Sequence, residues 1–172
     1  MLLFSVSTLL AATVLQAVSA PTHEPPIFPF QFQYLFTATI NFTAPAIPPV
    51  PLPGGYTLSV QVIYGTIDGP AGSGEIYGGT AYPKYFNNQT VEHPHIIVYG
   101  KLDGAADEGY FQVHEDGVAT NVTHSTRIYV TVSGERFKYI NDGFVLANTI
   151  ISEDGLSLMA RCYLVTDAVP RV

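Results

Sequence analysis

The chain has 172 residues, 7 basic and 14 acidic side chains, a net charge of −7, one cysteine and no tryptophan. This length favours one domain, because domains typically hold about 100–200 residues. So few basic residues exclude a nucleic-acid-binding stripe and a polybasic membrane anchor. The single cysteine excludes a disulfide framework within the chain and a multi-cysteine zinc site.

Residues 1–20 are typical of a secretory signal peptide. An apolar stretch runs from Leu2 to Val18 and leads into the small residues Ser19 and Ala20, near which we expect cleavage. The alternative is a membrane anchor, but an apolar run of about 17 residues is at the lower limit of a span. We therefore expect the secretory pathway or secretion, and no stable membrane anchor.

Three Asn-x-Thr sequons begin at Asn41, Asn88 and Asn121, and none has proline in the middle. In a secreted protein each is a candidate N-glycan acceptor. A glycan must face solvent, so each asparagine also marks the outward face of its segment. We expect at least two of the three to be used.

Two proline-rich stretches follow the predicted signal peptide. Residues 21–30 hold four prolines, which predicts an extended arm. Residues 45–53 are a second run, expected to be a rigid loop within a single domain over 31–172. Exchange of these segments between two subunits could produce a homodimer.

The remaining sequence predicts an all-β fold. Runs of β-branched and aromatic residues alternate with polar ones, and no stretch has helical periodicity. Five Asp-Gly dipeptides punctuate them, and both residues tolerate the positive φ of tight hairpin turns. We predict a single antiparallel barrel of lipocalin type with seven to eight strands, since closure removes exposed edges. The dipeptides are at 68–69, 103–104, 116–117, 142–143 and 154–155.

The predicted strands follow one another with short connections. Residues 81–92 carry Pro83 and several amides, which indicates a loop. The strands are expected at 31–43, 56–67, 75–80, 95–102, 109–115, 120–133, 136–151 and 156–166.

Alternation along these strands places many of the 11 tyrosines and 10 phenylalanines on inner faces. In 31–43, Asn41 marks the polar face, so the even positions point inward. In 56–67, Tyr64 shares a face with Val62. One interpretation is core packing, and the other is an aromatic-lined ligand cavity. The candidate ligand-binding residues are Tyr34, Phe36, Phe42 and Phe111.

His124 is the main candidate for chemistry. If Asn121 points outward, parity on the same strand places His124 inside the barrel. It is then either a hydrogen-bonded core histidine or a general acid or base in the lumen. A lumen tyrosine, with Tyr64 as the candidate, could share that catalytic role.

Other reactive side chains point more weakly to function. His93 and His95 could share a strand face and hold a metal, but Pro94 between them favours two loop histidines. His114 is expected near the end of a hairpin. The lone Cys162 sits among apolar residues and is expected to be buried and inert. No nucleophile elbow, phosphate loop or zincin motif is present, and we expect no metal or cofactor.

Four short motifs carry a resemblance to known proteins: YLFTAT at 34–39, YGTIDGP at 64–70, GGT at 78–80 and EDGL at 153–156. Through these motifs the chain resembles a family of small fungal and bacterial β-barrel proteins known mainly as a domain of unknown function. Through its small size, signal peptide, sequons and aromatic β pattern it also looks similar to the glycosylated hetero-Diels–Alderases of fungal tropolonic sesquiterpene pathways.

These resemblances imply a cofactor-independent cyclase that joins a tropolone quinone methide to a humulene-type alkene, and they carry over no catalytic residue. A cycloaddition needs no nucleophile, so missing catalytic motifs do not exclude it. The alternatives are a non-catalytic barrel that binds a small hydrophobic molecule and a secreted structural or effector glycoprotein. A small hydrophobic molecule is the expected partner in the first two cases.

Overall fold

The computed structural model describes residues 30–103, 109–120 and 124–167. The signal peptide over 1–20, most of the arm over 21–30, and Asn121 lie outside these ranges. Among the described residues, no helix is long and apolar enough to cross a membrane.

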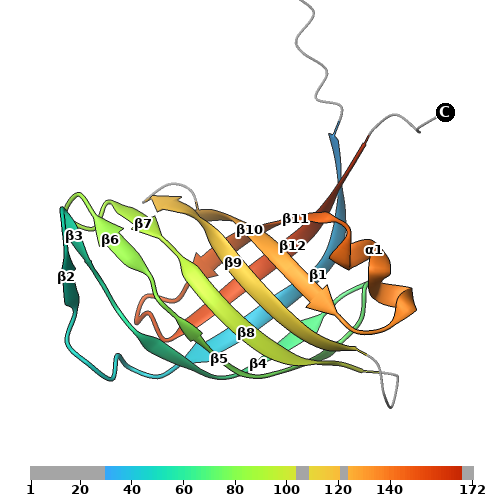
Figure 1. Ribbon diagram of the computed structural model, residues 1–172, viewed down its shortest axis with the longest axis horizontal. Helices are drawn as coiled ribbons and strands as arrows, with labels where there is room; N and C mark the ends of the chain where they lie inside the picture. Colours follow the sequence, from blue (N-terminus) through green and yellow to red (C-terminus); the bar gives the residue numbers. More distant parts are fainter. Residues whose placement is uncertain (1–29, 104–108, 121–123, 168–172) are drawn as a thin grey trace, which may run out of the picture.

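Eight antiparallel strands form a closed barrel (Figure 1), which confirms the predicted fold. They follow the ring order β10-β11-β12-β1-β4-β5-β8-β9, and pairing of β9 with β10 closes the ring. Their bounds are β1 Phe30–Phe42, β4 Val60–Asp68, β5 Gly74–Ala81, β8 His95–Leu102, β9 Tyr110–Thr120, β10 His124–Val132, β11 Phe144–Ile151 and β12 Ser157–Asp167.

Four short strands extend the barrel wall at one end. β3 leads into β4, β5 leads into β6 and β7 leads into β8, with breaks at Leu58–Ser59, Tyr82–Pro83 and Pro94. Proline lacks the N–H that a strand ladder needs, so two of the three breaks have a direct cause in the sequence. The short strands are β2 Val50–Leu52, β3 Gly55–Thr57, β6 Lys84–Phe86 and β7 Val91–His93.

The loop predicted over 81–92 is wrong, because β6 and β7 form a hairpin there. Its turn contains Asn87, Asn88 and Gln89, with φ angles of 49°, 54° and 70°. Asparagine tolerates this left-handed region better than most residues. The amides that indicated a loop therefore make the turn of a hairpin.

A short helical segment lies at the end of the barrel away from β2 and β3 (Figure 1). It consists of a 3₁₀ turn, Glu135–Phe137, and α1, Lys138–Asn141. Phe137 and Ile140 are 4% and 1% exposed and join the core. The first half of the strand predicted at 136–151 is therefore wrong, since one turn is too short to show helical periodicity.

A bulge in β1 changes which aromatic side chains face inward. The β1–β12 register shifts between Tyr34 and Phe36, so Leu35 and Phe36 both point into the core. Before the bulge, residues 30–34 are exposed on both faces of the strand. Phe32 and Tyr34 are 61% and 37% exposed, so the inward orientation predicted for them is wrong.

A register shift also turns the side chain of Tyr64 away from the barrel interior. The β1–β4 register shifts between Asn41 and Phe42, opposite Tyr64 and Val62. Val62 points inward, whereas Tyr64 is 57% exposed. The predicted lumen position of Tyr64 is therefore wrong.

The Asp-Gly dipeptides do not all mark hairpin turns. Gly155 lies in the turn between β11 and β12, with a φ of 70°. Asp116–Gly117 instead lies inside β9. A Cβ on Gly117 would be 2.6 Å from the Ser125 carbonyl oxygen, so glycine there permits the close approach of β10.

The barrel interior is mostly aliphatic. Within the described part of the chain, the only buried polar or charged residues are Glu115, Thr126 and Thr149. Cys162 is 1% exposed, and burial raises its thiol pKa. The thiol is thus held in the unreactive form, in line with its expected burial.

Candidate functional site

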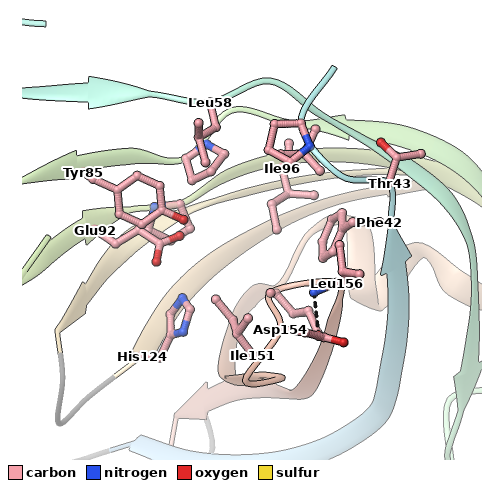
Figure 2. Close-up of a pocket in the computed structure, with 17 residues that line it drawn as sticks. Phe42, Thr43, Leu58, Tyr85, Glu92, Ile96, His124, Ile151, Asp154 and Leu156 are labelled. Atoms are coloured by element: carbon pink, nitrogen blue, oxygen red, sulfur yellow. Dashed lines mark hydrogen bonds between the residues drawn. The ribbon is translucent and has the colours of Figure 1, made fainter. Parts of the chain in front are cut away.

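A pocket of about 210 Å³ opens where the strands bend. Leu58, Pro83 and Pro94, one from each strand break, line it. The other wall comes from the end of β1 and from the β11–β12 turn. Figure 2 shows Tyr85, Glu92 and His124 along one side, with Phe42, Thr43 and Leu156 across from them.

Most of the lining is apolar, and the polar groups are few. Thr43, Tyr85, Glu92, His124 and Asp154 supply the polar side chains. Such a combination is typical of small-molecule sites. The apolar lining residues are Phe42, Pro45, Leu58, Val60, Ala81, Pro83, Pro94, Ile96, Ile151, Leu156 and Leu158.

Strand register places three of these polar residues in one row. Tyr85 on β6 lies opposite Glu92 on β7. Glu92 in turn lies opposite Ala119 on β9, and Ala119 lies opposite His124 on β10. The row therefore crosses four strands, and a methyl group separates the carboxyl from the imidazole.

Glu92 is adapted to hold a proton near neutral pH. Burial raises its pKa from 4.5 to about 7, and the charge of Glu115 adds to the effect. A carboxyl group with such a pKa can donate or accept a proton under physiological conditions. Glu92 is thus the strongest acid–base candidate in the pocket.

Its neighbours in the row are also kept neutral. Burial raises the pKa of the Tyr85 hydroxyl, and the nearby Glu92 raises it further. Burial lowers the pKa of His124. The Nε2 atom of His124 is buried and has no hydrogen-bond partner among the residues that the structure describes. The row therefore offers neutral donors and a neutral acceptor.

Asp154 has the opposite electrostatic character at the exposed rim. Its Oδ1 accepts hydrogen bonds from the Ser152 hydroxyl at 2.6 Å and from the Leu156 N–H at 2.9 Å. These bonds favour the carboxylate and lower its pKa, with the Ser152 bond acting most. Asp154 shapes the turn and leaves negative charge at the pocket mouth.

Deeper in the barrel is a second, much smaller void of about 20 Å³. Ile96 lines both this void and the mouth pocket, so its side chain lies between them. Glu115 and Cys162 also line the inner void. The pocket and the void are therefore successive parts of one lumen.

The structure brings together only some of the residues predicted for the site. His124 and Phe42 line the mouth pocket, whereas Phe36 and Phe111 surround the inner void. Tyr34 lies outside the barrel lumen, and so does Tyr64. The outward orientation of both follows from the register shifts of β1 and β4.

The other histidines of the described residues, His93, His95 and His114, are not part of the pocket lining. His95 Nδ1 pairs with Asp116 Oδ1 at 2.6 Å. The His114 ring is 6.0 Å from that of His95. His93 packs edge-on against Phe86. No group of three or more His, Cys, Asp or Glu in the described ranges is placed to hold a metal ion.

Sequence reasoning missed Glu92 and Tyr85. Both fall in the segment 81–92 that was predicted to be a loop, where alternation carries no weight. Pro83 and Pro94 were the available signal, because two prolines at strand ends indicate a bend. The residues around the bend do not by themselves predict a pocket, because its other wall comes from distant parts of the sequence.

No known protein family matches the chain, and no curated protein matches it. Solved structures do. A β-barrel-like protein from Acinetobacter baumannii matches with a TM-score of 0.67 and 11% identity, covering 84% of this chain and 99% of that one. A Clostridium acetobutylicum protein of unknown function matches with a TM-score of 0.68 and 11% identity, covering 80% and 99%.

An enzyme from Penicillium herquei is also similar, with a TM-score of 0.63 and 15% identity over 79% of this chain and 95% of that one. Identities this low carry the fold and no particular activity. The chain thus has the fold of small β-barrel proteins, among them proteins of unknown function and a fungal enzyme.

Proposed function

We propose that the protein is a cofactor-independent small-molecule cyclase, and specifically a hetero-Diels–Alderase that joins a tropolone quinone methide to a humulene-type alkene. The observation that carries the proposal is the row of Tyr85, Glu92 and His124 in an otherwise apolar pocket. Likeness of the fold to a fungal enzyme agrees with it.

The pocket has the features that a cycloaddition needs. Holding two reactants in register can lower the barrier by about 7–11 kcal/mol. The Tyr85 hydroxyl and a protonated Glu92 are donors for an oxygen that gains negative charge in the transition state. The apolar walls keep water away from a reactive quinone methide.

Pocket size sets how the reactants would lie. Its volume of about 210 Å³ is below the ~300–1,000 Å³ of typical ligand pockets. One reactant would occupy the interior near Glu92. The second would lie over the rim, where Leu156 is 41% exposed.

The test is turnover by the purified full-length glycoprotein. A hydroxymethyl tropolone that dehydrates to the quinone methide is mixed with humulene, and the adducts are followed by chiral chromatography and mass spectrometry. We expect faster formation of one stereoisomer than in buffer. His124→Ala should lower this rate by roughly 10²-fold, as for loss of an acid–base group. His114→Ala, which alters a histidine outside the pocket, is the matched control.

A racemic product formed at the buffer rate would reject the cyclase. The remaining candidate would then be a non-catalytic carrier, which the largely apolar pocket lining favours. A carrier binds the same molecules and releases them unchanged. A structural glycoprotein is less well supported, since it predicts a filled barrel without a pocket.

A further inference from the structure

We propose that Glu92 and His124 act together as a clamp for the hydroxyl group of a neutral, otherwise apolar ligand. The proposal rests on the proposed function and names the ligand class of the same pocket. The ligand would be an alcohol, a phenol or an enol whose carbon skeleton fills the apolar part.

The clamp follows from the register of three strands. Glu92 and His124 each lie opposite Ala119, on its two sides. Neighbouring strands are about 4.8 Å apart, so the two backbones are separated by about twice that distance. Ala119 is buried and small, and its methyl group leaves the longer side chains free to approach the same point.

The two groups have complementary hydrogen-bonding roles. A protonated carboxyl group donates a hydrogen bond, and a neutral imidazole accepts one at its bare nitrogen. A hydroxyl group accepts one bond and donates another, so it satisfies both partners at once. His124 lines the pocket, and its buried Nε2 lacks a partner among the described residues, so a ligand hydroxyl that reaches this atom would satisfy it.

The charge of the pocket disfavours anionic ligands. Its ionisable side chains are Glu92, Asp154, Tyr85 and His124, and no lysine or arginine lines this part of the described structure. A carboxylate ligand would bring negative charge beside two acidic groups without a cation to balance it. Fatty-acid anions, a common cargo of barrels, are therefore poor candidates.

Binding should depend on the protonation of Glu92. The groups that face it are Tyr85 on β6, Glu115 on β9, His124 on β10 and, across the pocket, Asp154. Burial and the charge of Glu115 set the Glu92 pKa near 7. Above this value Glu92 loses the proton that it would donate, so an alcohol should bind less tightly as the pH rises.

Three fluorescent probes with one skeleton test the ligand class: 2-naphthylmethanol, 2-naphthoate and 2-naphthylmethylamine. Each is titrated into the full-length protein at pH 6 and at pH 8.5. We expect the alcohol to bind at least tenfold more tightly than the carboxylate at pH 6, and about tenfold more weakly at pH 8.5 than at pH 6. A positively charged amine would show the opposite trend, because it would pair with the Glu92 carboxylate.

Substitutions test whether Glu92 and His124 cause the pH-dependent binding of the alcohol. Glu92→Gln keeps the size and a donor, so the alcohol should still bind but with the pH dependence removed. Glu92→Leu and His124→Ala should each weaken binding about tenfold. Glu75→Gln, on an exposed glutamate of β5, is the matched control and should behave as wild type.

Tighter binding of the amine than of the alcohol at pH 6, tighter binding of the carboxylate than of the alcohol at pH 6, or an unchanged pH dependence in Glu92→Gln would each overturn the clamp. Because the assay measures binding alone, its result is separate from turnover. Alcohol binding without cyclisation would support the clamp and reject the cyclase. Cyclisation by the wild type, together with alcohol binding that neither Glu92→Leu nor His124→Ala weakens, would reject the clamp and leave the cyclase standing.

Discussion

The Thr149 hydroxyl on β11 donates a hydrogen bond to Oε1 of Glu115 on β9, 3.5 Å away inside the barrel. Glu115 is 3% exposed. Burial raises its pKa above the ordinary 4.5, and the bond from Thr149 only partly opposes this. The folded protein therefore keeps a proton on Glu115 at pH values where the unfolded chain has already lost it.

This sets the sign of a pH effect on stability. Above about pH 4.5 the unfolded state binds fewer protons at this site than the folded state, so the Glu115 contribution to the free energy of unfolding falls as the pH rises. Glu115→Gln removes the titration and keeps the size. We expect urea denaturation to show the variant gaining stability relative to wild type between pH 4.5 and pH 8. Glu75→Gln should show no such gain, and an equal offset of Glu115→Gln at both pH values would contradict the argument.

Ile96 controls the depth of the pocket. Replacing it by alanine removes the side chain between the mouth pocket and the inner void, at a cost of about 2–5 kcal/mol in the free energy of unfolding. We expect Ile96→Ala to bind 3-(2-naphthyl)propanol more tightly relative to 2-naphthylmethanol than wild type does. Ile76→Ala, which enlarges the inner void and leaves the mouth pocket unchanged, should cost similar stability without this change in preference. Equal preferences in the two variants would show that Ile96 does not set the depth.

Cys162 should be protected from thiol reagents. Its side chain is 1% exposed, and burial keeps it as the neutral thiol. We expect the native protein to react with 5,5′-dithiobis(2-nitrobenzoate) only at the rate of barrel opening, and the protein in urea to react at once. Rapid stoichiometric labelling without denaturant would mean that β12 is accessible in the native state.

Of the two sequons in the described residues, the one at Asn88 is more accessible to glycosylation. It is exposed at the tip of the β6–β7 hairpin, whereas Asn41 is half-buried in β1 between β4 and β12. Asn88→Gln should therefore remove one glycan from the secreted protein. Endoglycosidase treatment followed by intact-mass measurement checks this, and Asn41→Gln gives the comparison. An unchanged mass for Asn88→Gln would show that this sequon is unused.

The barrel could be predicted from the sequence because alternation is a local signal. The strand expected at 95–102 forms as β8 with those bounds, and closure was expected because it removes exposed strand edges. Tyr34 and Tyr64 were misplaced because single-residue bulges exchange the faces of a strand. A bulge is set by the partner strand, so alternation in one strand does not reveal it.

The candidate site was less predictable than the fold. The parity argument for His124 started from Asn121, which lies outside the described residues, and His124 itself lines the pocket. The relation of Glu92 to His124 depends on β9, which lies between them and contributes only Ala119. A row built across four strands leaves no spacing pattern along the chain.

Three breaks, at Leu58–Ser59, Tyr82–Pro83 and Pro94, divide the short strands β3, β6 and β7 from the strands of the eight-strand ring. The eight-strand ring closes without β2, β3, β6 or β7, while the β6–β7 hairpin carries Tyr85 and Glu92. Substitutions or changes of length in these hairpins can therefore alter what the pocket accepts without disturbing ring closure. The ligand preference of the pocket and the closure of the ring therefore depend on different strands of the same sheet.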